Sequence, residues 1–301
     1  MKKWMKPIVA ATLLGGLLPA GTSAFAASAD SNQVFIDGRY QDSAITSQGR
    51  TLVQLRSLDD PAWLTYTYDA KSGVVTATSK DKSKVVTLKA GQKTATVNGA
   101  SVKLDASIVN KDGRTYVPLR FISESLGATV TYNSKDKRAI VRTPAGQTKF
   151  EALMRGDLPE ARKAAISLQA VQGKDVLSPL GEGFSTEYVF PQGEALKFTT
   201  EYKGLKTYIE INADGIAEVK WQGDSYVPDG KKAREKGTKP AAFGDSVYFY
   251  DNWMGETLMF GKIDASGSRT ELGNYSRIDN PQYKNVVIVP IDDESRTDGK
   301  K

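Results

Sequence analysis

The 301-residue sequence contains no cysteine and no histidine. Without cysteine there is no disulfide, so the fold must be stabilised by core packing alone. The missing residue types also exclude Ser-His-Asp triads, Cys-His pairs and the common zinc sites. We therefore predict that the protein is not an enzyme and that it uses no metal ion and no other cofactor.

Long hydrophobic runs are also absent, apart from one near the N-terminus. Three lysines precede the apolar run 8–18, which is followed by small residues that end in AFA at 24–26. This pattern is typical of a secretory signal peptide, here residues 1–26. The run is shorter than the roughly 20 residues that a membrane-spanning helix needs. We expect a secreted, cell-wall-associated protein with no transmembrane segment after signal cleavage.

Charge is unevenly distributed along the chain, whose formal net charge is +6. Residues 27–150 hold 18 basic and 11 acidic side chains, whereas residues 151–301 hold 20 and 24. The change of sign indicates a domain boundary near residue 150, and two domains fit the chain length. A basic domain outside the cell suits an anionic cell-wall polymer or glycan, and we expect no nucleic acid partner. Dispersed charges are also typical of a solvated surface without any partner.

One motif occurs twice, 64 residues apart. GRTLVQLRSLDDPAWLTYTYD begins at Gly49 and GRTYVPLRFISESLGATVTYN begins at Gly113, with nine of 21 positions identical. Around the second copy, Asn98-Gly99 between alternating segments predicts a hairpin. Pro118 followed by an apolar stripe predicts a short helix that Gly127 ends. Strands are predicted at 115–117, 129–132 and 138–142.

The first copy departs from this pattern in its helix. Pro61 lies within the corresponding segment and disfavours helix at the residue before it. We expect one turn over residues 55–59 at most, with Trp63 filling part of the space, and the sequence leaves open whether the helix is kept. The predicted fold class is α+β, with two small antiparallel sheet-plus-helix repeats followed by a mostly antiparallel β domain.

The segment VNGASVKLD at 97–105, together with the second motif, resembles the copper amine oxidase N-terminal domain, a stalk domain found in many secreted proteins of Gram-positive bacteria. The resemblance is strong for residues 94–143, weaker for 33–78 and absent beyond about 150. It implies an α+β module in a secreted or wall-associated protein. It does not imply amine oxidation, because that chemistry belongs to a separate domain whose copper is held by three histidines.

The second half of the chain shows two further patterns. Apolar residues in 147–173 recur at helical spacing, interrupted by Gly156 and Pro159, which indicates two short helices between the domains or packed on the second. From Thr186 onward, alternating segments indicate an antiparallel sheet or sandwich of unknown family. The predicted strands lie at 205–211, 216–221, 246–250, 257–263, 268–272 and 285–291.

The expected organisation has five parts, and the charged end of the chain is expected to be disordered. They are a signal peptide (1–26), a duplicated stalk-like domain (27–146), a helical connector (147–175), a β-rich domain (176–291) and a disordered tail (292–301).

The candidates for ligand contact are Arg50, Arg114, Tyr116 and Trp253. Strand alternation places Arg114 and Tyr116 on one side of a strand, with Arg50 in the equivalent place of the first copy. The arginines would present a paired basic site to a polyanion, or would cover the sheet with their aliphatic stems. Trp253 has a turn-like setting, where an exposed indole suits a sugar ring.

One segment of the second half partly matches a calcium-binding loop. Residues 210–218 place Glu, Asn, Asp and Glu as in the first nine positions of such a loop, but the twelfth position is Trp221, so a hairpin turn is the preferred interpretation.

These observations favour an exported, non-enzymatic scaffold or binding protein of the cell envelope. The alternatives are a cell-wall hydrolase that uses a pair of carboxylates, and a lectin-like binding module.

Overall fold

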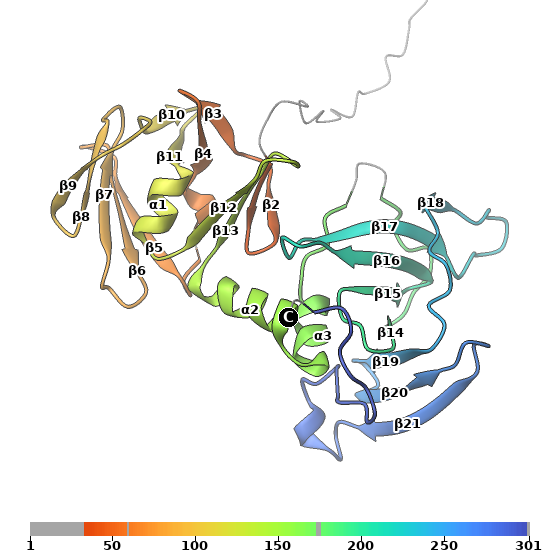
Figure 1. Ribbon diagram of the computed structural model, residues 1–301. Helices are drawn as coiled ribbons and strands as arrows, with labels where there is room; N and C mark the ends of the chain where they lie inside the picture. The colour runs from red at the N-terminus through yellow and green to blue at the C-terminus, as the bar shows by residue number, and fades with distance from the viewer. Residues whose placement is uncertain (1–32, 59, 173–175, 300–301) are drawn as a thin grey trace, which may run out of the picture. The chain divides into compact units, whose positions relative to one another are not determined.

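The computed structural model describes residues 33–58, 60–172 and 176–299 (Figure 1). The predicted signal peptide lies outside these residues. Within them, no helix combines the length and the apolar character that crossing a membrane requires.

Residues 33–142 of the described chain form three sheets, with the strand orders β12-β13-β1-β2, β10-β11-β4-β3 and β5-β6-β7-β8-β9. Neighbouring strands are antiparallel, except that β1 and β13 are parallel. One cluster of buried apolar side chains draws on all three sheets. The strands are β1 Gln33–Ile36, β2 Arg39–Gln41, β3 Ile45–Ser47, β4 Arg50–Gln54, β5 Leu64–Asp69, β6 Val74–Ser79, β7 Val85–Lys89, β8 Thr94–Val97, β9 Ala100–Lys103, β10 Val109–Lys111, β11 Arg114–Pro118, β12 Thr129–Asn133 and β13 Arg138–Arg142.

The two copies of the motif meet in one sheet. Strands β4 and β11 pair antiparallel, and Val53 is directly opposite Val117, its own equivalent 64 residues later. The expected β-rich fold with antiparallel sheets is confirmed. The described residues do not, however, form two separate sheet-plus-helix units, because the buried central strands of the two copies pair with each other. This pairing covers strand edges that would otherwise be exposed.

The helices of the two copies differ as the sequence predicts. Helix α1 covers Leu119–Ser125, directly after Pro118, and Gly127 follows it with a φ of 87°. The first copy keeps only a 3₁₀ turn, η1, at Leu55–Leu58. Trp63 is buried beside it, and its Nε1 donates a hydrogen bond to the carbonyl of Leu126 at 3.0 Å. The expectation of one short turn with Trp63 filling the space is therefore confirmed.

Two short helices follow strand β13, as predicted. Helix α2 covers Pro144–Arg155 and helix α3 covers Leu158–Ile166. Each has a capped start, because Thr143 Oγ1 accepts from the amide of Gly146 and an Asp157 carboxylate oxygen accepts from the amide of Glu160. Such caps satisfy amide groups that the first helical turn leaves without partners.

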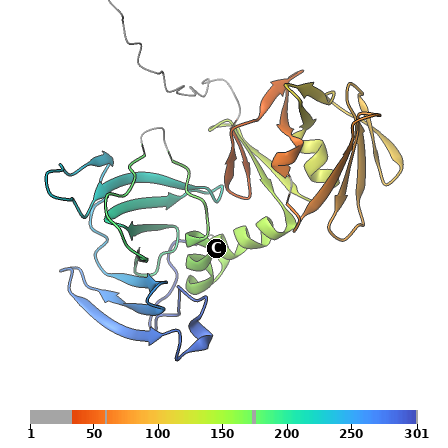
Figure 2. The same cartoon turned by 180° about the vertical axis from the view of Figure 1, so that it is seen from behind.

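The remainder forms one antiparallel sheet of eight strands in the described residues, ordered β18-β17-β16-β15-β14-β19-β20-β21. It is a single sheet and not a sandwich. Helices α2 and α3 lie beside it in both views (Figures 1 and 2), and their apolar side chains join its core. The strands are β14 Ser185–Pro191, β15 Lys197–Tyr202, β16 Leu205–Ile211, β17 Ala217–Asp224, β18 Glu235–Gly237, β19 Ser246–Asn252, β20 Thr257–Ile263 and β21 Arg269–Ser276, and a 3₁₀ turn, η2, covers Pro281–Tyr283.

The predicted strand at 285–291 is wrong. Its apolar residues Ile288, Val289 and Ile291 are buried in the same core as α2 and α3, but the segment pairs with no strand. A short apolar run indicates that a segment is buried, but it does not determine the secondary structure of that segment. Here the apolar pattern reflects burial alone.

The predicted disordered tail is also wrong for residues 292–299. Glu294 forms an ion pair with Arg162 of α3 at 2.6 Å, and the two side chains are only 2% and 1% exposed. Arg296 donates to the carbonyls of Leu153 and Gly156, and an oxygen of Asp298 accepts from the amides of Ala195 and Leu196. These charged side chains are held in the fold because each of them contacts a group on an element that is distant in sequence.

The proposed calcium loop is the β16–β17 hairpin turn, as preferred. Asn212 accepts from the amide of Asp214 and donates to Glu218, whose other contacts are Lys220 at 2.6 Å and Arg138 at 2.9 Å. The acidic side chain at the end of the loop is thus engaged by two cations.

We predict that Glu294→Ala lowers the free energy of unfolding by about 3 to 5 kcal/mol, because it leaves the Arg162 guanidinium buried without its carboxylate. Urea unfolding followed by tryptophan fluorescence measures the loss. Arg120→Ala is the control, since its pair with Glu124 is exposed and 3.9 Å long, and such pairs contribute about 0 to 1 kcal/mol. Losses of equal size would contradict a structural role for the tail.

Candidate functional site

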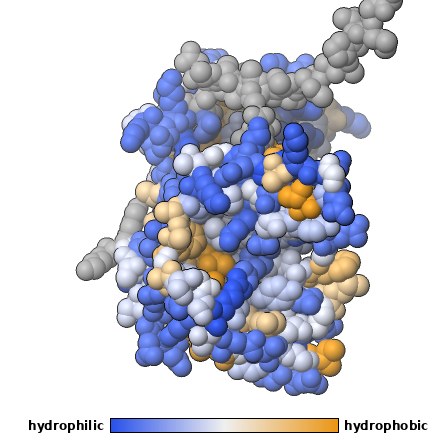
Figure 3. Space-filling view, turned by 90° about the vertical axis from the view of Figure 1, so that its right-hand side faces the viewer, coloured by the Kyte–Doolittle hydropathy of each residue, from blue (hydrophilic) through white to orange (hydrophobic). Residues whose placement is uncertain are grey.

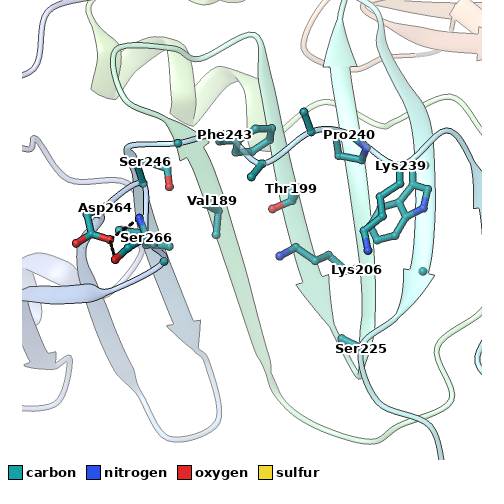
Figure 4. Close-up of a pocket in the computed structure, with 18 of the residues that line it drawn as sticks. Val189, Thr199, Lys206, Ser225, Lys239, Pro240, Phe243, Ser246, Asp264 and Ser266 are labelled. Carbon is teal, nitrogen blue, oxygen red and sulfur yellow. Dashed lines mark hydrogen bonds between the residues drawn. The ribbon is translucent and has the colours of Figure 1, made fainter.

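The eight-stranded sheet has one covered face and one open face. Phe190, Phe198 and Phe249 point to the covered face and pack with α2 and α3. Across the open face runs the segment 238–245, and Figure 4 shows Pro240 and Phe243 on it. Between this segment and the strands lies a groove of about 600 Å³, within the size range of small-molecule sites. We name it the sheet groove.

The floor of the sheet groove follows from strand alternation. Val189 of β14 is opposite Thr199 of β15, and Lys206 of β16 is opposite Gly223 of β17. Alternate residues of a strand share a face, so these side chains point away from the covered face. Figure 4 shows Val189, Thr199 and Lys206 on neighbouring strands next to the crossing segment, with Asp264 and Ser266 on the side opposite Lys239.

A β-bulge turns Trp221 into the groove. The β16–β17 register shifts between Tyr208 and Ile209, so that Trp221 is opposite Tyr208 while Val219 is opposite Ile209. A bulge redirects the side chains beyond it. The indole then lies over Gly223, where an added Cβ would come within 2.4 Å of the ring. Glycine at 223 is therefore needed for this placement.

Two acids of the sheet groove are held by internal hydrogen bonds. Asp224 accepts three hydrogen bonds from Arg234, and these, foremost from the side chain, lower its pKa. Asp264 accepts from Ser266 and from the amide of Ser268, and the pKa of its carboxyl is lowered, chiefly by the Ser266 hydroxyl. A general acid needs a raised pKa, so neither residue suits that role.

Glu187 and Glu201 are directly opposite each other on β14 and β15. A glycosidase requires a pair of carboxylates, although neither glutamate lines the sheet groove. Both, however, are engaged. Glu187 accepts two hydrogen bonds from Arg269 at 2.6 and 2.9 Å, and Glu201 accepts one from Ser225 at 2.7 Å. The Glu187 hydrogen bonds raise the pKa of Arg269.

Two lysines supply positive charge to the sheet groove. Lys206 and Lys239 both line it, and no carboxylate of the described residues is within ion-pair distance of either. The Lys239 ammonium lies 5.7 Å from the centre of the Trp221 ring. The groove therefore combines two cations with an aromatic ring, and it suits an anionic ligand with an apolar or ring-shaped part.

The residues predicted from the sequence lie elsewhere. Arg50 and Arg114 are exposed, and each lines a smaller groove in the first part of the chain. Tyr116 is only 6% exposed and its hydroxyl accepts from Gln54, so its ring belongs to the core and does not face a ligand. The alternation argument placed Tyr116 correctly beside Arg114 along the strand but did not foresee that this side is covered.

Trp253 is 53% exposed in the turn between β19 and β20, where its ring meets Phe184 edge to face at 5.1 Å. It lines none of the grooves described here. On the face drawn in Figure 3, hydrophobic side chains form several separate groups among polar ones. Trp253 thus remains a predicted contact residue outside the sheet groove.

Sequence reasoning missed Lys206 and Lys239. Lys206 stands in the alternating strand LKTYIEI, so the pattern places it on one face with Tyr208 and Glu210. Nothing in the sequence shows that the segment containing Lys239 folds back over that face. Within the described part of the chain, no cluster of three or more acidic residues is arranged to hold a metal ion.

Comparison with known proteins supports the resemblance found in the sequence. Residues 32–141 match the family model of the copper amine oxidase N-terminal domain, so this segment is similar to domains of that type. The domain is not the catalytic one in copper amine oxidases. The match ends before α2, and the eight-stranded sheet lies outside it. No curated protein matches the chain.

A pH dependence follows from Tyr208, which donates to Glu210 at 2.5 Å. Burial, then this hydrogen bond, raises its pKa above the ordinary value of 10.0. The phenol therefore stabilises the folded state fully below pH 10 and loses this contribution as the pH rises further. We predict that Tyr208→Phe is less stable than the wild type at pH 8 and that the gap narrows at pH 11, measured by urea unfolding.

Tyr226→Phe is the control for this measurement, because Tyr226 is exposed and the substitution removes the same hydroxyl. Its effect should stay within about 0.5 kcal/mol at both pH values. A Tyr208→Phe gap that is constant with pH would show that the phenol titrates alike in the folded and unfolded states.

Proposed function

We propose that this protein is an exported, non-enzymatic binding protein of the cell envelope. In this proposal the copper amine oxidase N-terminal-type domain is a support, and the β-rich domain binds an anionic cell-wall polymer or glycan in the sheet groove. The observation that carries the proposal is the pair Lys206 and Lys239, which face the groove without ion-pair partners in the described residues, while the neighbouring acids are engaged.

The chemistry of the sheet groove supports binding more than catalysis. Asp224 and Asp264, which line the groove, are each held by hydrogen bonds that favour the charged carboxylate. Hydrolysis of a glycosidic bond needs one carboxyl that gives up a proton. A preorganised groove with two available ammonium groups instead stabilises a bound anion without any bond being broken.

The two alternatives concern the same sheet, although Glu187 and Glu201 do not line the sheet groove. The opposed Glu187 and Glu201 are the observation that favours a hydrolase. The Trp221 and Phe243 rings, which both line the groove, favour a lectin-like module for neutral sugars. Lysine-dependent, salt-sensitive binding distinguishes the preferred function from both, because neutral sugars carry no charge to screen.

We predict that Lys206→Ala/Lys239→Ala weakens co-sedimentation of the full mature chain with purified Gram-positive cell walls by about tenfold, since two charge-assisted contacts are lost. Lys231→Ala/Lys232→Ala is the matched control. It removes the same charge from exposed residues that do not line the groove, so its effect should be less than about twofold. Binding by the wild type should fall as salt is raised.

Three results would contradict the proposal. Equal losses for the two double variants would show that net charge alone determines binding. Binding that is insensitive to salt would favour the lectin-like module. Release of reducing sugar from the walls by the wild type, absent in Glu187→Gln, would establish the hydrolase.

A further inference from the structure

The pairing of β4 with β11 brings arginines of the two motif copies together. Because Val53 is opposite Val117, continuing the register outward brings Arg50 towards Arg120 and Arg56 towards Arg114. The lining of two grooves agrees with this. One contains Arg50 and Arg120, and the other contains Arg56 and Arg114.

The two grooves are related by the duplication. The first, of about 330 Å³, combines the Gly-Arg-Thr of copy one with the Leu-Arg and Tyr132 of copy two. The second, of about 300 Å³, combines the Gly-Arg-Thr of copy two with the Leu-Arg and Tyr68 of copy one. We name them the Arg50 groove and the Arg114 groove. Each thus offers two guanidinium groups and a half-exposed tyrosine ring.

Their electrostatics differ. In the Arg50 groove, Nε of Arg50 donates to Asp105 at 2.5 Å, and Asp105 itself lines the groove. Arg120 has Glu124 at 3.9 Å. No carboxylate lines the Arg114 groove, and neither Arg56 nor Arg114 has an ion-pair partner among the described residues. Among the described residues, no acidic side chain therefore pairs with the two arginines of this groove.

One arginine of the Arg114 groove is also held in place. The hydroxyl of buried Tyr116 accepts from Nε2 of Gln54, and Oε1 of Gln54 accepts from Nε of Arg56 at 2.9 Å. This leaves the four N–H groups of the two terminal nitrogens for a ligand. In the Arg50 groove the position equivalent to Gln54 is Pro118, whose ring carries no polar group that could orient Arg120.

We propose that the Arg114 groove binds a single oxyanion, a phosphate or sulfate ester carried on a sugar, and that Asp105 closes the Arg50 groove to anions. Two guanidinium groups suit one tetrahedral oxyanion, because each can donate two parallel hydrogen bonds. The rings of Tyr66 and Tyr68, two residues apart on β5, offer flat surfaces for the attached sugar. A nucleic acid backbone would instead require a longer row of cations. This site is separate from the sheet groove and does not depend on its function.

The test uses isothermal titration calorimetry with a sulfated tetrasaccharide from heparin, at low salt. All proteins carry Lys206→Ala/Lys239→Ala, so that the sheet groove does not contribute. Arg56→Gln/Arg114→Gln should lower the affinity at least about tenfold, since charge-assisted hydrogen bonds are lost. Arg50→Gln/Arg120→Gln, with the same charge change, should lower it less than about threefold. Asp105→Asn should raise the affinity or add a second site.

Two further arms identify the source of the oxyanion. Inorganic sulfate should compete with the tetrasaccharide but bind more weakly, because it lacks the sugar. Equal affinity would overturn the sugar assignment in favour of a free anion, and tighter binding of a single-stranded oligonucleotide of equal charge would overturn it in favour of nucleic acid. Equal losses in the two arginine double variants would overturn the site itself. All four arginines are exposed, and unchanged urea midpoints would confirm that the variants fold.

Discussion

The pairing of β4 with β11 is the interaction on which the first domain depends. It joins the two copies of one motif so that Val53 is opposite Val117, and both residues are fully buried. Each strand alone would present an unpaired edge, and main-chain hydrogen bonds between the copies remove both edges at once. The same register determines which arginines meet, so the grooves are a consequence of the pairing. The two copies thus form two similar grooves, which differ in that Asp105 lines one and Gln54 lines the other.

The second domain is organised by the contrast between the two faces of its sheet. Helices α2 and α3 and the segment after η2 bury the apolar face, which supplies the core. Polar and aromatic residues remain on the other face, where the segment 238–245 encloses part of the surface. Because the sheet is wide, residues from seven of its strands line one groove. Bulges in β17 and β21 adjust the directions of individual side chains within that frame.

Charge serves two different purposes in this molecule. Arg162 and Glu294 are fully buried, where each needs the other, because an unpaired charge in the core is strongly destabilising. Lys206, Lys239, Arg56 and Arg114 line grooves and lack ion-pair partners in the described residues. Paired charges fasten distant segments together, while the others are available to a ligand. Sequence composition does not separate these two groups, since both consist of ordinary charged residues.

The sequence by itself determined the local structure. The Asn98-Gly99 turn, helix α1 after Pro118, the shortened turn before Pro61 and the strands at 205–211 and 257–263 all follow from patterns within a few residues. The motif also identified the domain family. These features depend on backbone preferences and on alternation, which act over short distances.

Only the tertiary structure decided which charges are buried and which residues meet. Tyr116 was expected at the surface and is covered, and the tail was expected to be free but is fixed by Arg162, 132 residues away in sequence. Lys239 reaches the sheet groove because its segment folds back over the strands. Such contacts form between side chains distant in sequence, and their free energies depend on burial and on partners that no local pattern contains.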